Sequence, residues 1–393
     1  MRKPAKQNGS EHDTIVISRR ISLFRNLASA VFPERAPSDE ARAVREKVVA
    51  ACADLLKKSG GGTLSETARD DAGWIERMAV YERLHDGDPA DDKRGEVVFL
   101  DAYGLPDIIV NSSDHVEISV DCAGVSFADA FTAAGKIADE LGKRLNFANG
   151  EPFGWLSADP EHAGVGMRVS QSFCFGALLI LRELDAVLRG VERIGFDIVP
   201  VYGDNGPDAQ HHELAPGSCY RISPVPYDGM DAAALAAKAE RVFGALVEIE
   251  KNARLALFAD HVSRDMLEDY VMRAVGVGAG ARTVSETEYI DLYVALAFAV
   301  DMGVLKEARP PDDRKSLVGF FNDSVALFSL QQAMTRSSDF DDDHADFLRR
   351  RFLADLCRRD FSRFIPEWSD RVSDGMNDLF GMMIPGGKTK KRK

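Results

Sequence analysis

Cysteine is scarce in this sequence of 393 residues, and long apolar runs are missing. No CxxC pair occurs, so the spacing predicts neither a zinc site nor a disulfide framework. No run approaches the roughly 18 apolar residues that a membrane span needs, and the opening letters MRKPAKQNGSEHD lack the apolar core of a secretory signal. These absences predict a protein of the reducing cytoplasm with no membrane partner. The five cysteines are Cys52, Cys122, Cys174, Cys219 and Cys357.

Basic residues are also fewer than acidic ones. Lys and Arg number 49 against 63 Asp and Glu, and the formal net charge is −14. This charge excludes a whole-protein nucleic-acid binder, because a phosphate backbone would be repelled. The basic tail at 385–393 is the exception. Solvation explains a run this short, and an anion or nucleic-acid contact is expected only there.

Periodicity divides the chain into two parts. Short strand-like runs and amphipathic helices alternate up to residue 261, and nearly every segment from 264 to 380 has helical spacing. Within this pattern we predict single helices over 172–189 and 232–261 and a loop near 276–280. The expected domains are a flexible tail at 1–12, an α/β domain at 13–261, a helical domain at 262–384 and the basic tail at 385–393.

Several segments, taken in order, resemble one family. IVISRRISLFRN (15–26) is similar to S-R-x-R-x-x-R-N, and NSSDHVEI (111–118) to N-E-E-D-H-x-R-I. ADPEHAGVGMR (158–168) is similar to C-P-T-N-x-G-T-G-x-R, and IVPVYGD (198–204) to V-R-G-x-x-G-E, with GSCYRIS following. These are motifs of the ATP:guanido phosphotransferases, the phosphagen kinases. Later segments resemble the helical domain that the bacterial protein-arginine kinases carry after the catalytic domain.

The resemblance implies a fold class as well as a chemistry. The expected fold is α+β, with a mixed or antiparallel sheet flanked by helices in the glutamine-synthetase-like arrangement of phosphagen kinases, followed by an all-helical domain. The chemistry is transfer of the γ-phosphoryl group of ATP to a guanidinium.

The implied general base is missing. Free guanidinium has a pKa above ~12, so a base must orient and deprotonate a very weak acid. The resemblance places that base, the second Glu of N-E-E-D-H, at Ser113. A Ser hydroxyl is no base near pH 7, and loss of a positioned base typically costs about 10²–10⁴-fold in rate. Neighbouring residues keep the family's spacing, which argues against a shifted alignment. They are Asn111, Asp114, His115, Pro160, Gly164 and Gly203.

The implied ring of phosphate-binding arginines is broken. Arg20 and Arg168 match two of its members, while Ser22, Glu117 and Val199 stand at three others. Glu117 reverses the charge and would repel a polyphosphate. Arg20 has two open interpretations, a vestigial nucleotide ligand or a structural ion-pair partner. ATP and Mg²⁺ are expected only if nucleotide binding survives, and otherwise no cofactor is expected.

The implied substrate side keeps some acidity. Asp159 stands where the family has the cysteine that contacts the guanidinium, beside His162 in place of Asn, and Asp204 stands for a second acidic residue. A carboxylate at 159 can still pair with a guanidinium. His211 and His212 on a long polar loop could suggest a metal site, but their spacing is not of a metal type and no metal is expected. Asp114 and His115 are interpreted as structural hydrogen-bonding residues at a strand end.

Three functions follow from these observations. The first is a pseudokinase that acts as a binding or regulatory module for arginine-containing or phosphoarginine proteins, or pairs with a homologous kinase. The second is an active guanidino (protein arginine) kinase, with Asp159 or Asp204 as base and arginines such as Arg19 or Arg221 completing the ring. The third is a purely structural subunit. A homodimer is expected from the resemblance alone.

Overall fold

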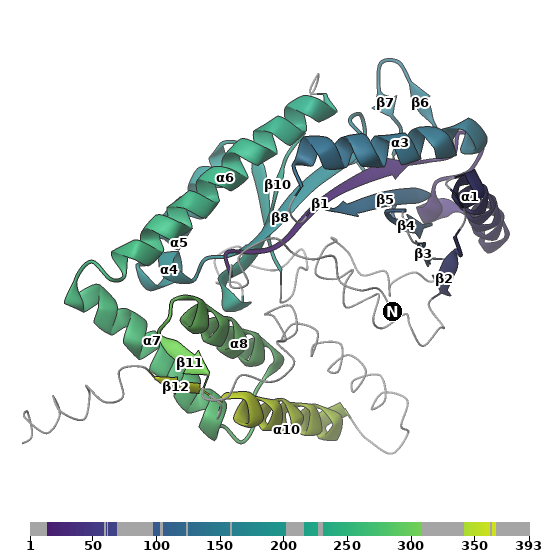
Figure 1. Cartoon of the computed structure of the whole chain (residues 1–393). Helices are drawn as coiled ribbons and strands as arrows, with labels where there is room; N and C mark the ends of the chain where they lie inside the picture. The colour runs from purple at the N-terminus through teal and green to yellow at the C-terminus, as the bar shows by residue number, and fades with distance from the viewer. Residues whose placement is uncertain are drawn as a thin grey trace, which may run out of the picture.

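The computed structural model describes residues 14–58, 60, 62–68, 97–102, 105–122, 125–157, 159–201, 216–226, 231–307, 342–361 and 364–366. Its centre is an eight-stranded sheet of order β2-β3-β4-β5-β1-β8-β10-β9, in which every neighbouring pair is antiparallel (Figure 1). The strands are β1 (Val16–Arg25), β2 (Ser65–Ala68), β3 (Val98–Asp101), β4 (Asp107–Val110), β5 (Val116–Asp121), β8 (Met167–Cys174), β9 (Phe196–Pro200) and β10 (Cys219–Pro224).

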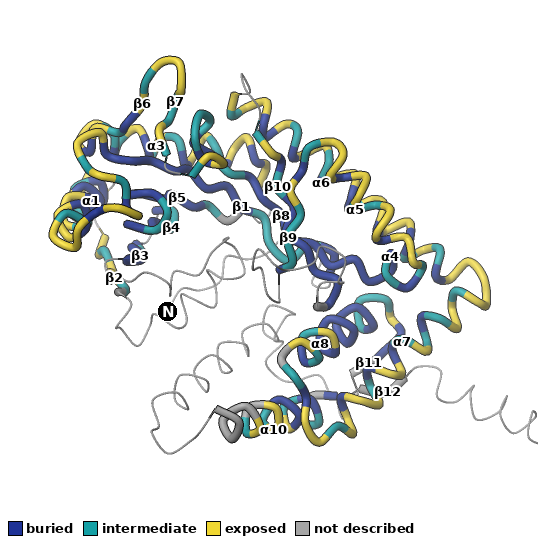
Figure 2. Tube along the Cα trace, turned by 180° about the vertical axis from the view of Figure 1, so that it is seen from behind, coloured by how far each residue is buried: buried dark blue, intermediate teal, exposed yellow. Residues whose placement is uncertain are grey.

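Helices cover one face of this sheet. Alternation along β1 turns Ile21 and Leu23, both fully buried, toward helices α1 (Ser38–Lys58), α3 (Phe127–Leu145) and α6 (Ala232–Ala256). Figure 1 shows α3 and α6 running along that face, and in Figure 2 the central strands β5, β1 and β8 are largely buried while the outer sides of these helices are exposed. The opposite face of the sheet carries Arg20 and Ser22 of β1 and Arg168 of β8, and we call it the site face.

Local sequence signals explain the limits of the helices. Ser126 caps α3 by accepting a hydrogen bond from the Asp129 N–H, and Asn146 ends it in the left-handed conformation. The helix predicted over 232–261 is α6, which ends earlier, at Ala256. Asp260 accepts hydrogen bonds from Val262 N–H and Ser263 N–H and so begins a new helix, α7 (His261–Gly280). The predicted end of this helix was therefore wrong.

Two further predictions were wrong for reasons of packing. The helix predicted over 172–189 is the end of β8 followed by α4 (Gly176–Ile180) and α5 (Leu184–Arg193). Strand β8 is buried on both faces over most of its length, so it lacks the alternation that marks a strand. The loop predicted at 276–280 lies inside α7, where Gly278 permits close packing, since a Cβ there would lie 2.6 Å from the Phe361 ring.

The last part of the chain is mostly helical but not all-helical. It contains α7, α8 (Glu286–Asp301) and α10 (Asp342–Phe361), and also an antiparallel pair, β11 (Leu305–Glu307) with β12 (Phe364–Pro366). Its buried side chains join the same apolar core as the sheet, and Gly176 of α4 lies directly against Phe298 of α8. The chain turns between α6 and α7 near the predicted boundary at 261, while the division into domains stays a prediction.

The predicted absence of disulfides was wrong, because Cys174 and Cys219 are bonded across β8 and β10. Short strands β6 (Asn149–Gly150) and β7 (Gly154–Trp155) form a separate hairpin, and 3-10 turns occupy Pro33–Arg35 and Pro216–Ser218. Within the described ranges, no helix has the length and apolar character needed to cross a bilayer.

Candidate functional site

The site face collects the residues that the resemblance singles out. Ser22 on β1 lies opposite Ser119 of β5 on one side and opposite Arg168 of β8 on the other. Because side chains two apart share a face, Arg20 and Glu117 belong to the same surface. The sheet thus brings four of the five implied arginine positions, 20, 22, 117 and 168, onto three adjacent strands.

Two of those positions are joined by a chain of hydrogen bonds. The Ser119 hydroxyl donates to Glu117 Oε1 at 2.8 Å, and Ser119 Oγ lies 2.7 Å from Ser22 Oγ. All three side chains are buried, with Glu117 only 2% exposed. A hydrogen-bonded carboxylate thus lies where the resemblance implies two cations. The donor set here fits a triphosphate poorly, because a buried anion disfavours a second anion beside it.

Arginines nevertheless remain on this face. Arg168 donates to Glu161 Oε2 at 3.0 Å, an ion pair whose acidic partner is largely exposed. Such pairs contribute little stability, so this contact could be exchanged for another anion. Arg221 of β10 lies opposite Val199 of β9, next to the third implied arginine position.

Arg19 does not belong to this group. It points to the helix-covered face, where its guanidinium pairs with Glu240 at 2.8 Å and lies 4.2 Å from the centre of the Phe127 ring. The suggestion that Arg19 could complete a phosphate-binding ring is therefore wrong, because its neighbour Arg20, and not Arg19, is on the site face.

The turn between β4 and β5 carries Ser113, which is half-buried. Beside it, Asp114 is buried and fully engaged. Its Oδ1 accepts hydrogen bonds from Asn26 Nδ2 and from Ser157 Oγ at 2.6 Å, and its Oδ2 lies 2.7 Å from His162 Nδ1. Since a carboxylate only accepts, His162 Nδ1 carries the proton.

His115 is likewise held on both sides of its ring. Its Nδ1 accepts from the Leu27 N–H at 3.1 Å, and its Nε2 lies 2.9 Å from the Val31 carbonyl oxygen, to which it donates. Its backbone N–H donates to Asn26 Oδ1. The structural interpretation of Asp114 and His115 is confirmed, because these contacts bind β5 to the end of β1.

His162 is stacked on Phe24 of the site face, with ring centroids 3.4 Å apart. Asp159 lies at the rim of this arrangement, about one-third exposed, with its Oδ2 3.7 Å from His162 Nδ1. The structure therefore brings the predicted Asp159 together with His162 and Asp114 at one end of the site face. Asp159 is the more accessible of the two carboxylates.

A glycine loop supports this end of the site. Gly166, at φ +62°, leaves room for Arg25, which donates to the carbonyl oxygens of Phe24 and Gly166 and lies 3.8 Å from the centre of the Trp155 ring. Burial lowers the pKa of Arg25 to about 10, partly offset by Asp139 and Asp114. Arg25 is a structural cation and not part of the phosphate-binding set.

Three of the sequence-derived candidates cannot be placed. Asp204, His211 and His212 lie outside the described residues. Among the residues that are described, no three His, Cys, Asp or Glu side chains lie close enough to hold a metal ion.

Sequence reasoning missed the partners that complete the site. Ser119 and Ser157 were not singled out, although each contacts a residue that was. A signal existed for Ser119, which lies two residues after Glu117 and so shares its face. None existed for Ser157, whose contact with Asp114 crosses 43 residues of sequence.

Comparison with known proteins decides the family. The profile described as "ATP:guanido phosphotransferase, C-terminal catalytic domain" matches residues 43–253, more than half of the chain. The chain belongs to the ATP:guanido phosphotransferase family. The matched range begins after β1, covers the β4–β5 turn and the glycine loop, and ends within α6.

Curated relatives extend the match. The chain is 28% identical over 301 residues to a protein-arginine kinase of Halothermothrix orenii, covering 76% of this chain and 82% of that kinase. It is 26% identical over 301 residues to a protein-arginine kinase of Bacillus pumilus, covering 77% and 80%. The predicted resemblance to the bacterial protein-arginine-kinase type is thereby confirmed.

A solved structure supports the fold. The duplicated taurocyamine kinase of Schistosoma mansoni, with bound transition-state-analogue components, superposes with a TM-score of 0.51 at 17% identity. The match covers 64% of this chain and 35% of that longer one. The predicted α+β fold with an antiparallel sheet flanked by helices is confirmed.

Proposed function

We propose that this member of the family is a pseudokinase, a binding or regulatory module that recognises arginine-containing or phosphoarginine proteins. The observation that carries the proposal is the hydrogen-bonded chain Ser22–Ser119–Glu117 on the site face. It replaces two implied phosphate-binding cations by two hydroxyls and one carboxylate, so it removes attraction for ATP and adds repulsion.

Ser113 supports the same conclusion on the side of the guanidinium, the second reactant of the family's reaction. A carboxylate at this position would orient a guanidinium and accept its proton, and a hydroxyl does neither. Asp159, in contrast, keeps an accessible carboxylate beside the buried Asp114–His162 pair. The substrate side of the site therefore keeps a group that can pair with a guanidinium.

The first experiment is a calorimetric titration with Mg-ATP, run on the full chain and on Arg168→Ala. The pseudokinase predicts no detectable heat and no change in melting temperature for either protein. Binding in the micromolar range that disappears in Arg168→Ala would overturn it.

The second experiment tests recognition directly. A protein phosphorylated on arginine and its unphosphorylated form are titrated against the chain and against Asp159→Ala. We expect binding that weakens in Asp159→Ala but not in Asp185→Ala, a matched removal of an exposed carboxylate on α5. Equal affinities for all three proteins would exclude Asp159 from the contact.

An active guanidino kinase is the second candidate, and Arg221 is the observation that favours it. Its position opposite Val199 puts a guanidinium on the strand beside a lost arginine, with Arg20 and Arg168 retained on the same face. This candidate predicts isotope transfer from ATP to arginine that Arg221→Ala abolishes. No transfer at high enzyme concentration would exclude it.

A further inference from the structure

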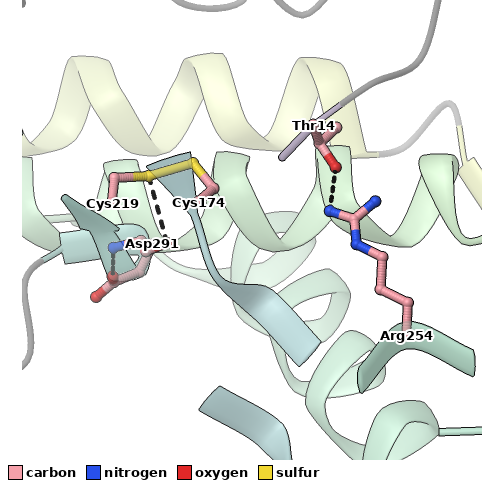
Figure 3. The surroundings of a disulfide bond; sticks show 6 residues. Thr14, Cys174, Cys219, Arg254 and Asp291 are labelled. Atoms are coloured by element: carbon pink, nitrogen blue, oxygen red, sulfur yellow. Dashed lines mark hydrogen bonds between the residues drawn. A yellow bond between two sulfur atoms is a disulfide. The ribbon is translucent and has the colours of Figure 1, made fainter. Parts of the chain in front are cut away.

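Cys174 and Cys219 are joined across two neighbouring strands (Figure 3). They lie directly opposite in the β8–β10 register, with Cα atoms 4.3 Å apart. This is close to the spacing of a non-hydrogen-bonded antiparallel pair, so the sheet itself brings the two sulfur atoms together. The other cysteines, Cys52, Cys122 and Cys357, are buried free thiols.

The pair occupies the site face of the sheet. Cys219 is two residues before Arg221 on β10, and Cys174 is two residues after Ser172 on β8, so alternation gives all four the same side. Both cysteines belong to a small apolar cluster, separate from the main core, that includes Val294 of α8. The disulfide thus lies where α8 meets the end of the site face.

The turn just before Cys219 is the direct contact with α8. The Gly217 N–H donates to the carboxylate of Asp291, and Figure 3 shows Asp291 beside the disulfide. Gly217 also has φ +66°, and a Cβ there would lie 2.6 Å from Val294 Cγ2. Anything that loosens the start of β10 therefore loosens the contact with the first half of α8.

The same geometry also accommodates the reduced pair, with Cys174 and Cys219 as free thiols. Cys219 Sγ lies 3.4 Å from the Gly217 carbonyl oxygen, so a free thiol there could donate its S–H to that oxygen. The β8–β10 ladder continues through three further residue pairs and holds the strands in either state.

A second anchor holds the far end of α8. Arg254 donates to Thr14 Oγ1 at 2.8 Å and also to Asp301, the last residue of α8. The bond to Thr14 is on the right of Figure 3, and neither of the two hydrogen bonds involves a cysteine. The hydrogen bonds that hold the far end of α8 therefore do not pass through the disulfide.

We propose that Cys174 and Cys219 form a reversible redox modification site that fixes or releases the turn at 216–219 against α8. A low-molecular-weight disulfide is the oxidant. One cysteine thiolate attacks it and releases one thiol, and the second cysteine then attacks the mixed disulfide and releases another. Two electrons and two protons leave the protein with the two released thiols. The proposal is independent of what the site binds.

The test uses the full chain equilibrated in glutathione buffers that range from reduced to oxidised. Differential alkylation and mass spectrometry report the state of each cysteine, and amide hydrogen exchange reports local opening. We expect Cys174 and Cys219 to convert together and reversibly. Reduction should speed exchange in 216–222 and 286–294 by about tenfold and leave 295–301 unchanged.

Variants separate a switch from a static link. The double variant Cys174→Ser with Cys219→Ser should show the faster exchange in every buffer, while Cys52→Ala, a distant buried control, should keep the redox response. Three results would overturn the proposal. They are a pair that stays reduced in every buffer, a disulfide that resists reduction in the native protein, and exchange in 216–222 that is equal in both states.

Discussion

Ser22 and Ser119 face each other across β1 and β5 with their Oγ atoms 2.7 Å apart, and the Ser119 hydroxyl donates a hydrogen bond to Glu117 Oε1. Two small hydroxyls and one carboxylate thus satisfy one another where the resemblance implies two long cations. The replacements are mutually consistent, since the Ser119 hydroxyl gives the buried Glu117 carboxylate a hydrogen-bond donor.

The network should contribute measurably to stability. Ser119→Ala removes the hydroxyl donor of Glu117 and the partner of Ser22, so we expect the free energy of unfolding to fall by about 1–3 kcal/mol. Urea unfolding measures it. Ser172→Ala is the matched control, because Ser172 is buried on the same face and its hydroxyl has no hydrogen-bond partner within the described structure. Equal losses in the two variants would show that the network contributes nothing.

Much of this arrangement could be predicted from sequence, and the limits have physical causes. Motif order and spacing survive where individual side chains change, so the family and the antiparallel fold were accessible. Strand β8 could not be predicted, because it is buried on both faces and so lacks the alternation of apolar and polar residues that marks a strand. The Cys174–Cys219 bond could not be predicted either, since it depends on the register of two strands whose cysteines are 45 positions apart in the sequence.

Asp114 should be the more sensitive of the two carboxylates near His162. Asp114→Asn turns an amide donor toward at least one of the three donors that Asp114 now accepts from, so we expect a loss of about 2–4 kcal/mol. Thermal unfolding measures it. Asp159→Asn, at the exposed rim, should change stability by less than about 1 kcal/mol. The reverse order would show that Asp114 is not the structural centre of this network.

The disulfide should stabilise the folded chain. Its cysteines are separated by 45 positions in the sequence, and loop-closure entropy then predicts a contribution of about 4 kcal/mol. Cys174→Ser in oxidising buffer, and the native chain after reduction, should therefore unfold at lower urea concentration by similar amounts. A native chain that is equally stable with and without reductant would show that the bond does not form in solution.

Two glycine variants can separate the effect of the Gly217–α8 contact on stability from the effect of backbone strain. Gly217→Ala places a Cβ 2.6 Å from Val294, while Gly303→Ala has nearly the same φ, +68° against +66°, and nothing within 4 Å. Both variants bear the cost of a left-handed alanine, about 1 kcal/mol. We expect Gly217→Ala to lose about 1–3 kcal/mol more, from overpacking against α8. Equal losses would mean that α8 does not press on this turn.

Glu250 should make stability depend on pH. It is fully buried, and burial raises its pKa, partly offset by the N–H groups of Ala177 and Leu178 and by Arg254. Between the ordinary and the raised pKa the folded state holds a proton that the unfolded state has lost, so stability falls as pH rises through that window. Glu250→Gln should remove this slope when urea unfolding is followed as pH rises from the ordinary pKa of a glutamate. Glu248→Gln, an exposed neighbour on α6, should keep it. Stability that instead rises with pH through the same window, only when Glu250 is present, would mean that its hydrogen bonds outweigh burial.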